Sequence, residues 1–152
     1  MAKMMISPRE PKKAMTVYDM GIKNDKLVYV VVASRPIPYP TGRSHIAYIG
    51  STEHGIARMA QSAAARAEDI LKPHGVSKFD VYPVSAAARQ GAKSWWKKLE
   101  RAFIIGFREE FGSPPKLNDP GRKFRRTNEF ELFTESVVKD ILHRLGDGGR
   151  SG

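Results

Sequence analysis

HIAYIGSTEHGIARM, residues 45–59, is the stretch of sequence that decides the fold. Its first part, HIAYIGS (45–51), favours a β-strand, and the alanine-rich segment that follows (55–72) favours a helix. Gly50, Ser51 and Thr52 lie between the two, which predicts a tight glycine turn leading into a helix N-terminus. The free N–H groups and the dipole of such a terminus attract anions. Ordinary capping of the helix by Ser51 or Thr52 is the alternative.

Three neighbouring segments extend this pattern into a sheet. LVYVVVAS (27–34) is continuous and β-branched, which predicts a buried strand paired antiparallel with 45–51. RPIPYPTGR (35–43) contains three prolines and a Thr-Gly step, and it predicts a loop. KFDVYPV (78–84) alternates and predicts a third strand, with Pro83 at an edge or a strand end.

Two further segments have the period of amphipathic helices. The first runs from about 86 to 111, ends at Gly112, and carries a core-facing stripe of Ala92, Trp96, Leu99, Phe103, Phe107 and Phe111. The second runs from 129 to 145 and is capped by Gly146; its apolar face either packs on the core or forms a dimer. The predicted fold class is therefore α+β, a small three-stranded antiparallel or mixed sheet flanked by helices.

Length and charge indicate the organisation of the chain and its partner. The 152 residues are expected to form one domain over 16–145, with a flexible basic arm (1–15) and a flexible tail (146–152). Lys and Arg number 26 against 16 acidic residues, a formal charge of +10. Such an excess is typical of proteins that bind polyanions, most often nucleic acid. A basic scaffold that binds other proteins is the alternative.

The composition also excludes several classes of site. There is no cysteine, so disulfides, zinc–thiolate centres and cysteine nucleophiles are ruled out. No apolar run reaches the roughly 18 residues of a membrane span, and the N-terminus has no apolar signal region. A cytoplasmic protein without membrane contact is expected. The four histidines, His45, His54, His74 and His143, do not have the spacing of metal ligands.

Four side chains stand out as candidates for chemistry on phosphate. Glu100 borders the apolar face of its helix, where a carboxylate suits a hard cation such as Mg²⁺, or alternatively pairs with a lysine. Arg58 has the forked guanidinium that binds phosphate, although it is equally a surface arginine. Tyr29 and Tyr48 lie in adjacent predicted strands, where they could orient or deprotonate a water, or simply pack across the strands.

Together these residues resemble the GIY-YIG nuclease superfamily. Its two tyrosine motifs correspond to Leu27-Val28-Tyr29 and Tyr48-Ile49-Gly50. Its arginine and its helical glutamate correspond to Arg58 and Glu100, and its asparagine corresponds to Asn118, which follows Pro114-Pro115-Lys116-Leu117. The resemblance covers residues 27 to 118.

The resemblance implies a metal-dependent endonuclease, monomeric or homodimeric, that hydrolyses phosphodiester bonds, with DNA favoured over RNA. Glu100 would bind one Mg²⁺ (or Mn²⁺), and Tyr29 would act as base or orient the water, supported by Tyr48. Arg58 would neutralise the phosphate, and Asn118 would fix Glu100 or the loop. The residues expected to hold the nucleic acid are Gly50, Ser51, Lys93, Lys97, Lys98, Arg122, Lys123, Arg125 and Arg126.

The chain departs from the family pattern at three places. Leu27-Val28 replaces Gly-Ile, and the interval between the two tyrosines is long, with the extra residues expected as a loop insertion in 35–43. Many members carry His, Tyr or Lys one helical turn after the arginine, where this chain has Ser62, and serine is a poor base. Either Tyr29 does that work, with His45 as a compensating group, or the protein is a degenerate member that binds nucleic acid without cleaving it.

Overall fold

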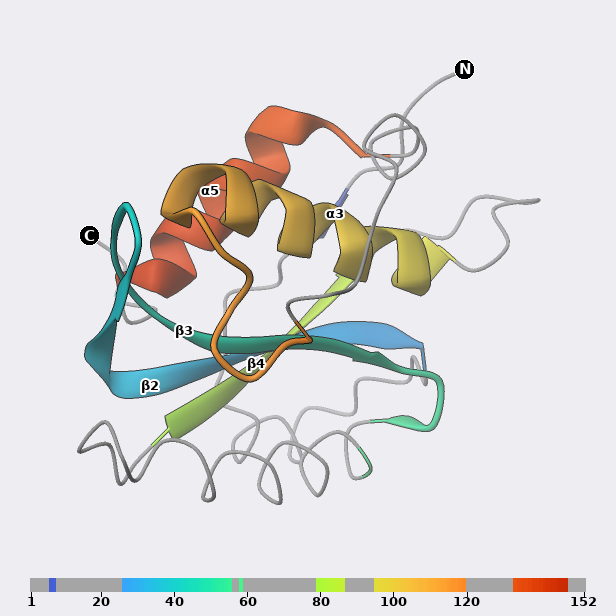
Figure 1. Ribbon diagram of the computed structural model, residues 1–152. Helices are drawn as coiled ribbons and strands as arrows, with labels where there is room; N and C mark the ends of the chain where they lie inside the picture. Colours follow the sequence, from blue (N-terminus) through green and yellow to red (C-terminus); the bar gives the residue numbers. More distant parts are fainter. Residues whose placement is uncertain are drawn as a thin grey trace.

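The computed structural model describes residues 6–7, 26–55, 58, 79–86, 95–119 and 133–147. Its elements are β1 (Ile6–Ser7), β2 (Leu27–Tyr39), β3 (Gly42–Thr52), β4 (Phe79–Ala86), α3 (Trp95–Phe111) and α5 (Glu135–Gly146). The strands form one sheet in the order β1-β4-β2-β3, and every pair is antiparallel. Helices α3 and α5 lie together over one face of this sheet (Figure 1). The predicted α+β fold is confirmed.

Strand β2 is the centre of the sheet. It pairs with β3 on one side and with β4 on the other, so that Val28 lies between Ser51 and Val84. All residues from Leu27 to Ala33 are buried, although their side chains alternate between the two faces of the sheet. This explains the continuous β-branched run, which is typical of a strand covered on both faces. The predicted pairing of the first two long strands is confirmed.

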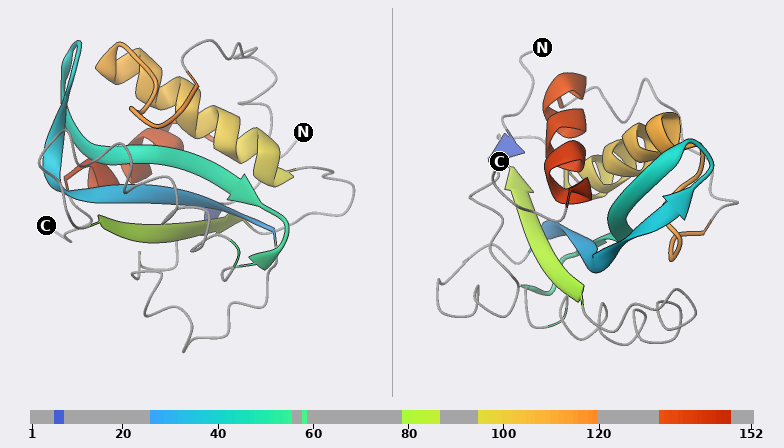
Figure 2. Two further views of the ribbon diagram at one scale, coloured as in Figure 1. Left: turned by 60° about the horizontal axis from the view of Figure 1, so that its bottom comes forward. Right: turned by 90° about the vertical axis from the view of Figure 1, so that its left-hand side faces the viewer.

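The predicted loop over 35–43 is wrong. Strands β2 and β3 continue through this segment as a hairpin that turns at Pro40 and Thr41, with a register shift between Val32 and Ile37. Prolines are compatible with this strand because β4 begins at Phe79, opposite Ala33, so that within the described residues the rest of β2 pairs only with β3. Figure 2 shows the hairpin curving away from the plane of the sheet.

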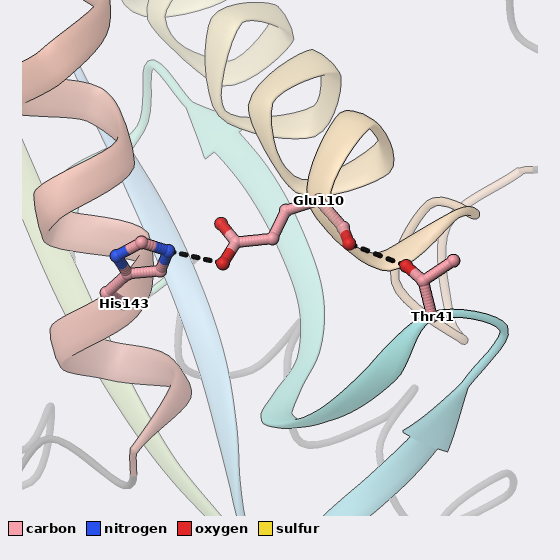
Figure 3. A network of polar contacts seen from close by, with 3 residues as sticks. All are labelled: Thr41, Glu110 and His143. Atoms are coloured by element: carbon pink, nitrogen blue, oxygen red, sulfur yellow. Dashed lines mark hydrogen bonds and ion pairs between the residues drawn. The ribbon is translucent and has the colours of Figure 1, made fainter.

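The tip of the hairpin is attached to the C-terminal end of α3. The N–H of Thr41 donates to the Phe111 carbonyl at 3.1 Å, and its hydroxyl donates to the Glu110 carbonyl at 2.6 Å. The Glu110 carboxylate in turn contacts the His143 imidazole on α5 (Figure 3). Three elements that are distant in sequence are therefore joined at this end of the molecule.

Part of the predicted N-terminal arm belongs to the sheet. Ile6 and Ser7 pair with Ala86 and Ser85 at the outer edge of β4. Such an addition uses main-chain hydrogen bonds, so the side-chain pattern of the arm gives no sign of it. The two described residues of β1 pair with Ser85 and Ala86, and Pro83 pairs with Tyr29 on the other side of β4.

Helix α3 contributes a large part of the core. Leu99, Phe103 and Phe107 are fully buried, as the stripe predicts. The helix ends at Phe111 because Gly112 adopts φ 82°, a left-handed conformation that glycine tolerates best. Its predicted first residue, Ala86, instead belongs to β4, and residues 87–94 lie outside the described part of the chain.

Helix α5 begins at Glu135, later than predicted, and it packs on the core. Its buried residues, which face α3 and the sheet, are Val138, Ile141, Leu142 and Leu145. Gly146 is the last helical residue and not the cap; Asp147 caps the helix by donating its N–H to the His143 carbonyl at 3.1 Å. A Cβ on Gly146 would lie 3.0 Å from Ser44 Oγ, so close packing explains this glycine.

Of the predicted helix over 55–72, only Gly55 and Arg58 are described, and both are helical. Neither α3 nor α5, the two long helices of the described ranges, has the length and apolar character needed to cross a membrane.

Candidate active site

Gly50 makes room for two tyrosine rings. It lies inside β3 opposite Tyr29, so the predicted tight turn at this glycine is wrong and its N–H belongs to the sheet, while helical residues begin at Gly55, as predicted. A Cβ on Gly50 would lie 2.6 Å from Tyr29 Cζ and 2.6 Å from Tyr48 Cε2. The two rings meet over the glycine with centroids 5.8 Å apart and planes tilted by 39°. Close approach, and not a special φ, therefore explains the glycine of Tyr48-Ile49-Gly50.

A pocket of about 290 Å³ opens beside these tyrosines, where β3 ends and α3 begins. Its lining residues are Tyr29, Ser51, Thr52, Glu53, His54, Arg58, Trp96 and Lys97. Four of them, Tyr29, Ser51, Arg58 and Lys97, are residues that the sequence analysis predicts for the site. They come from β2, β3, the segment after β3, and α3, so only the folded chain brings them together.

Glu100 is joined to this pocket through Ser51. The serine hydroxyl donates to Glu100 Oε2 at 2.5 Å, and the glutamate is only 8% exposed. Burying a carboxylate is costly unless hydrogen bonds or cations compensate for the lost water. The glutamate is therefore held in a defined position, and its carboxylate is bonded to the hydroxyl of Ser51, a residue that lines the pocket.

The mouth of the pocket is positively charged. Arg58 and Lys97 are both exposed lining residues. Lys26, which the sequence analysis does not single out, places its Nζ 4.7 Å from the centre of the Trp96 ring, and Trp96 also lines the pocket. A cation over an indole face is held by the ring quadrupole. Two cationic side chains therefore line the opening against one acidic side chain, Glu53, and Lys26 lies against the indole of Trp96, an arrangement that favours an anionic ligand.

Asn118 completes the outer edge of β3. Its side-chain amide donates to the Ile49 carbonyl at 2.8 Å and accepts the Ile49 N–H at 3.0 Å, while the N–H of Leu117 donates to the Ala47 carbonyl at 3.0 Å. Because β3 is the last strand of the sheet, these groups would otherwise lack a strand partner. Of the two predicted roles of Asn118, these bonds favour fixing the loop, directly onto Ile49.

The same loop is held at its start by Tyr39. The phenol donates to the Ile46 carbonyl at 2.6 Å and accepts the N–H of Lys116 at 3.2 Å. Burial raises the pKa of Tyr39, and the bond from Lys116 opposes this only in part. The phenol therefore stays protonated and keeps both bonds over the whole physiological pH range.

Replacing Asn118 with alanine is expected to lower the free energy of unfolding by about 1–3 kcal/mol, because both polar groups of the buried Ile49 backbone lose their partner. Urea unfolding measures the loss. Asn118→Asp keeps an acceptor for the Ile49 N–H but has no donor for the Ile49 carbonyl. Its free energy of unfolding is expected to lie between those of the wild type and the alanine variant. An alanine variant as stable as wild type would contradict the proposed role of this side chain.

Several predicted site residues lie elsewhere. The Nδ1 of His45 is 2.8 Å from the Ala33 carbonyl, and His45 does not line the pocket, so the geometry does not favour it as a substitute for the residue at position 62. Lys98 is half-buried on α3 and is not a lining residue either. The predicted residues outside the described part of the chain are Ser62, Lys93, Arg122, Lys123, Arg125 and Arg126.

The sequence analysis missed the short segment Thr52-Glu53-His54. All three residues line the pocket, and the N–H of His54 donates to the Thr52 hydroxyl at 3.1 Å. The only feature of the sequence that points to this segment is its position between Tyr48-Ile49-Gly50 and Arg58. The histidines do not have metal-ligand spacing, so the sequence alone gives His54 no role.

Comparison of the chain with models of known protein families, with curated proteins and with solved structures finds no match in any of the three.

Proposed function

We propose that this protein is a metal-dependent endonuclease that hydrolyses phosphodiester bonds, with DNA as the favoured substrate. One observation carries the proposal. A cation-rimmed pocket is lined by Tyr29 and Arg58, and its Ser51 wall is hydrogen-bonded to the buried carboxylate of Glu100. A phenol can orient a water, a guanidinium can stabilise charge on a phosphate, and a carboxylate can hold a hard cation, and all three groups lie next to one opening.

The cationic side chains bind and orient the phosphate. The guanidinium of Arg58 can donate two parallel hydrogen bonds to two phosphate oxygens, and it opposes the negative charge that develops on them during the reaction. Lys26 and Lys97 act on the neighbouring phosphates as point charges. The formal charge of +10 supports binding of the nucleic acid backbone over a longer distance.

Glu100 is the residue that would hold the metal. Among the described residues there is no group of three or more His, Cys, Asp or Glu side chains that could form a complete metal cage. Mg²⁺ does not require one, because it is commonly held by one or two carboxylates together with waters and substrate phosphates. The single hard oxygen donor of Glu100 fits that pattern, and the bond from Ser51 fixes its orientation. A bound divalent ion supplies positive charge that polarises the scissile phosphate.

Tyr29 lies where it can orient the attacking water. It is 4% exposed, it lines the pocket, and its ring is held between the Gly50 backbone and the ring of Tyr48. A ring locked in this way keeps its hydroxyl in one place. Tyr48 does not line the pocket, so its contribution is to hold the ring of Tyr29.

A second candidate function is nucleic acid binding without cleavage. Glu100 is largely buried and already bonded to Ser51, which is also what a purely structural glutamate would show. This candidate predicts salt-sensitive binding that does not depend on any divalent ion.

Cleavage assays on plasmid and branched DNA, and on RNA, with Mg²⁺ or Mn²⁺ distinguish these functions. The wild type is expected to nick DNA only when the metal is present. Arg58→Ala is expected to lower the cleavage rate by about 10²–10³-fold, the usual cost of removing a donor that stabilises transition-state charge. Arg58→Lys is expected to recover only part of the rate, because an ammonium lacks the fork.

The matched control is Arg43→Ala, which removes an equally exposed arginine from the hairpin. It is expected to cleave like the wild type. A wild type that binds DNA in a salt-sensitive way but never cleaves it would favour the second candidate. Equal losses of cleavage in the Arg43 and Arg58 variants would contradict a specific role for Arg58.

A further inference from the structure

His54 stands at the rim of the pocket with its imidazole in water. Its side chain is 71% exposed, and its backbone is tied to the Thr52 hydroxyl, so the residue has a fixed attachment point and an accessible ring. It lines the same pocket as Tyr29 and Arg58. Neither the resemblance nor the charge pattern gives this residue a role.

The proposed hydrolysis needs a group that accepts a proton. The water oxygen forms a new bond to phosphorus, the bond from phosphorus to the leaving sugar oxygen breaks, and that oxygen takes up a proton from solvent. The attacking water must lose one proton at the same time. The phenol of a tyrosine, with an ordinary pKa of about 10, keeps its proton at neutral pH, whereas an imidazole accepts one readily.

The groups around the imidazole suit this task. Glu53 places its Oε1 4.0 Å from His54 Nε2, which is longer than a hydrogen bond, so its negative charge lies beside the imidazole without fixing the ring. The other titratable or charged residues that line the pocket with His54 are Tyr29 from β2, Arg58 from the helical residues after β3, and Lys97 from α3. The base, the proposed water-orienting group and the proposed phosphate ligand therefore share one opening.

We propose that His54 is the general base, which takes the proton of the attacking water while Tyr29 orients that water. This inference rests on the proposed endonuclease function. It also explains how a chain with serine at position 62 can carry out the hydrolysis, because the base comes from the segment before the helix and not from the turn after its arginine.

The test compares wild type with His54→Gln and His54→Ala in single-turnover cleavage of plasmid DNA over a range of pH. We expect both variants to lose about a hundredfold or more in rate at neutral pH, the usual contribution of a general base, with DNA affinity unchanged. The pH dependence of the rate is expected to differ between wild type and both variants, because the group that accepts the proton of the water has been removed. Because the side chain is exposed, added free imidazole is expected to restore part of the activity of His54→Ala.

The control is His143→Gln, the same substitution on α5, where His143 contacts Glu110 at the far end of α3. Lys97 and Glu110 are separated by roughly 20 Å of helix at ~1.5 Å per residue, so this variant is expected to keep the wild-type rate and pH profile. His54 variants with wild-type rates and pH dependence would overturn the inference and leave the endonuclease proposal intact. His54 variants that lose DNA affinity, and that free imidazole does not rescue, would also overturn the inference. A wild type that never cleaves would overturn both proposals.

Discussion

Glu100→Gln is expected to abolish metal-dependent cleavage, with a fall of about a thousandfold in rate. Glutamine keeps the size of the side chain and can still accept the hydrogen bond from Ser51, but it lacks the negative charge that a hard divalent cation requires. Stabilisation of transition-state charge by a metal amounts to several kcal/mol, and each ~1.4 kcal/mol is a factor of ten in rate. Single-turnover cleavage at increasing Mn²⁺ concentration measures the effect.

The matched control is Glu109→Gln, which neutralises an exposed glutamate on the same helix. It is expected to cleave normally, and urea unfolding is expected to show that both variants remain folded. Because Glu100→Gln keeps a partner for Ser51, its loss of activity cannot be attributed to a broken core. Cleavage by Glu100→Gln at the wild-type rate would remove this residue from the metal site.

Gly50→Ala is expected to lower the free energy of unfolding by about 1–3 kcal/mol, the usual cost of forcing an extra carbon into a packed site. The new methyl group would lie 2.6 Å from a carbon of each tyrosine ring, closer than any non-bonded contact permits. Because Tyr29 is almost completely buried, its ring cannot move without displacing its neighbours. Urea unfolding measures the stability, and near-ultraviolet circular dichroism reports the changed environment of the rings.

Measuring Gly50→Ala both in the wild type and in a Tyr48→Ala variant shows whether contact with the tyrosine rings causes the loss of stability. Removing the ring of Tyr48 eliminates one of the two close contacts, so Gly50→Ala is expected to cost less in that background than in wild type. The same substitution is expected to reduce cleavage, because Tyr29 lines the pocket. An equal cost in both backgrounds would show that backbone strain, and not ring contact, sets the effect.

The hairpin marks a limit of what a local pattern can predict. Three prolines between 35 and 43 favour a loop, and this expectation failed because β4 begins at Phe79, opposite Ala33. Beyond that point β2 pairs, among the described residues, only with β3, and a proline without an N–H group is tolerated in a strand paired on one side. The length of a neighbouring strand is a property of the assembled sheet, and no feature of residues 35–43 encodes it.

The candidate site also combines features that the sequence predicts with features that depend on the tertiary structure. The residue types that suit phosphate chemistry, Tyr29, Arg58 and Glu100, could be chosen from the sequence because each carries a functional group with a recognisable preference. The pocket that Tyr29 and Arg58 share, the link from Ser51 to Glu100, and the presence of His54 beside them could not be derived. A histidine without metal-ligand spacing cannot be assigned a role from the sequence. Its place in the pocket depends on the fold, which brings the end of β3 and the start of α3 together.

The sequence by itself determined the pairing of the two long strands, the buried face of α3 and the end of that helix at Gly112. These features depend on periodicity and on backbone conformation, both of which are set by residues a few positions apart. Only the tertiary structure decided that Gly50 lies beneath two rings, that Ser51 holds Glu100 from 49 residues away, and that Asn118 completes β3 at Ile49 across 69 residues. Such contacts depend on strand register and on how helices pack against the sheet, which the whole chain sets together.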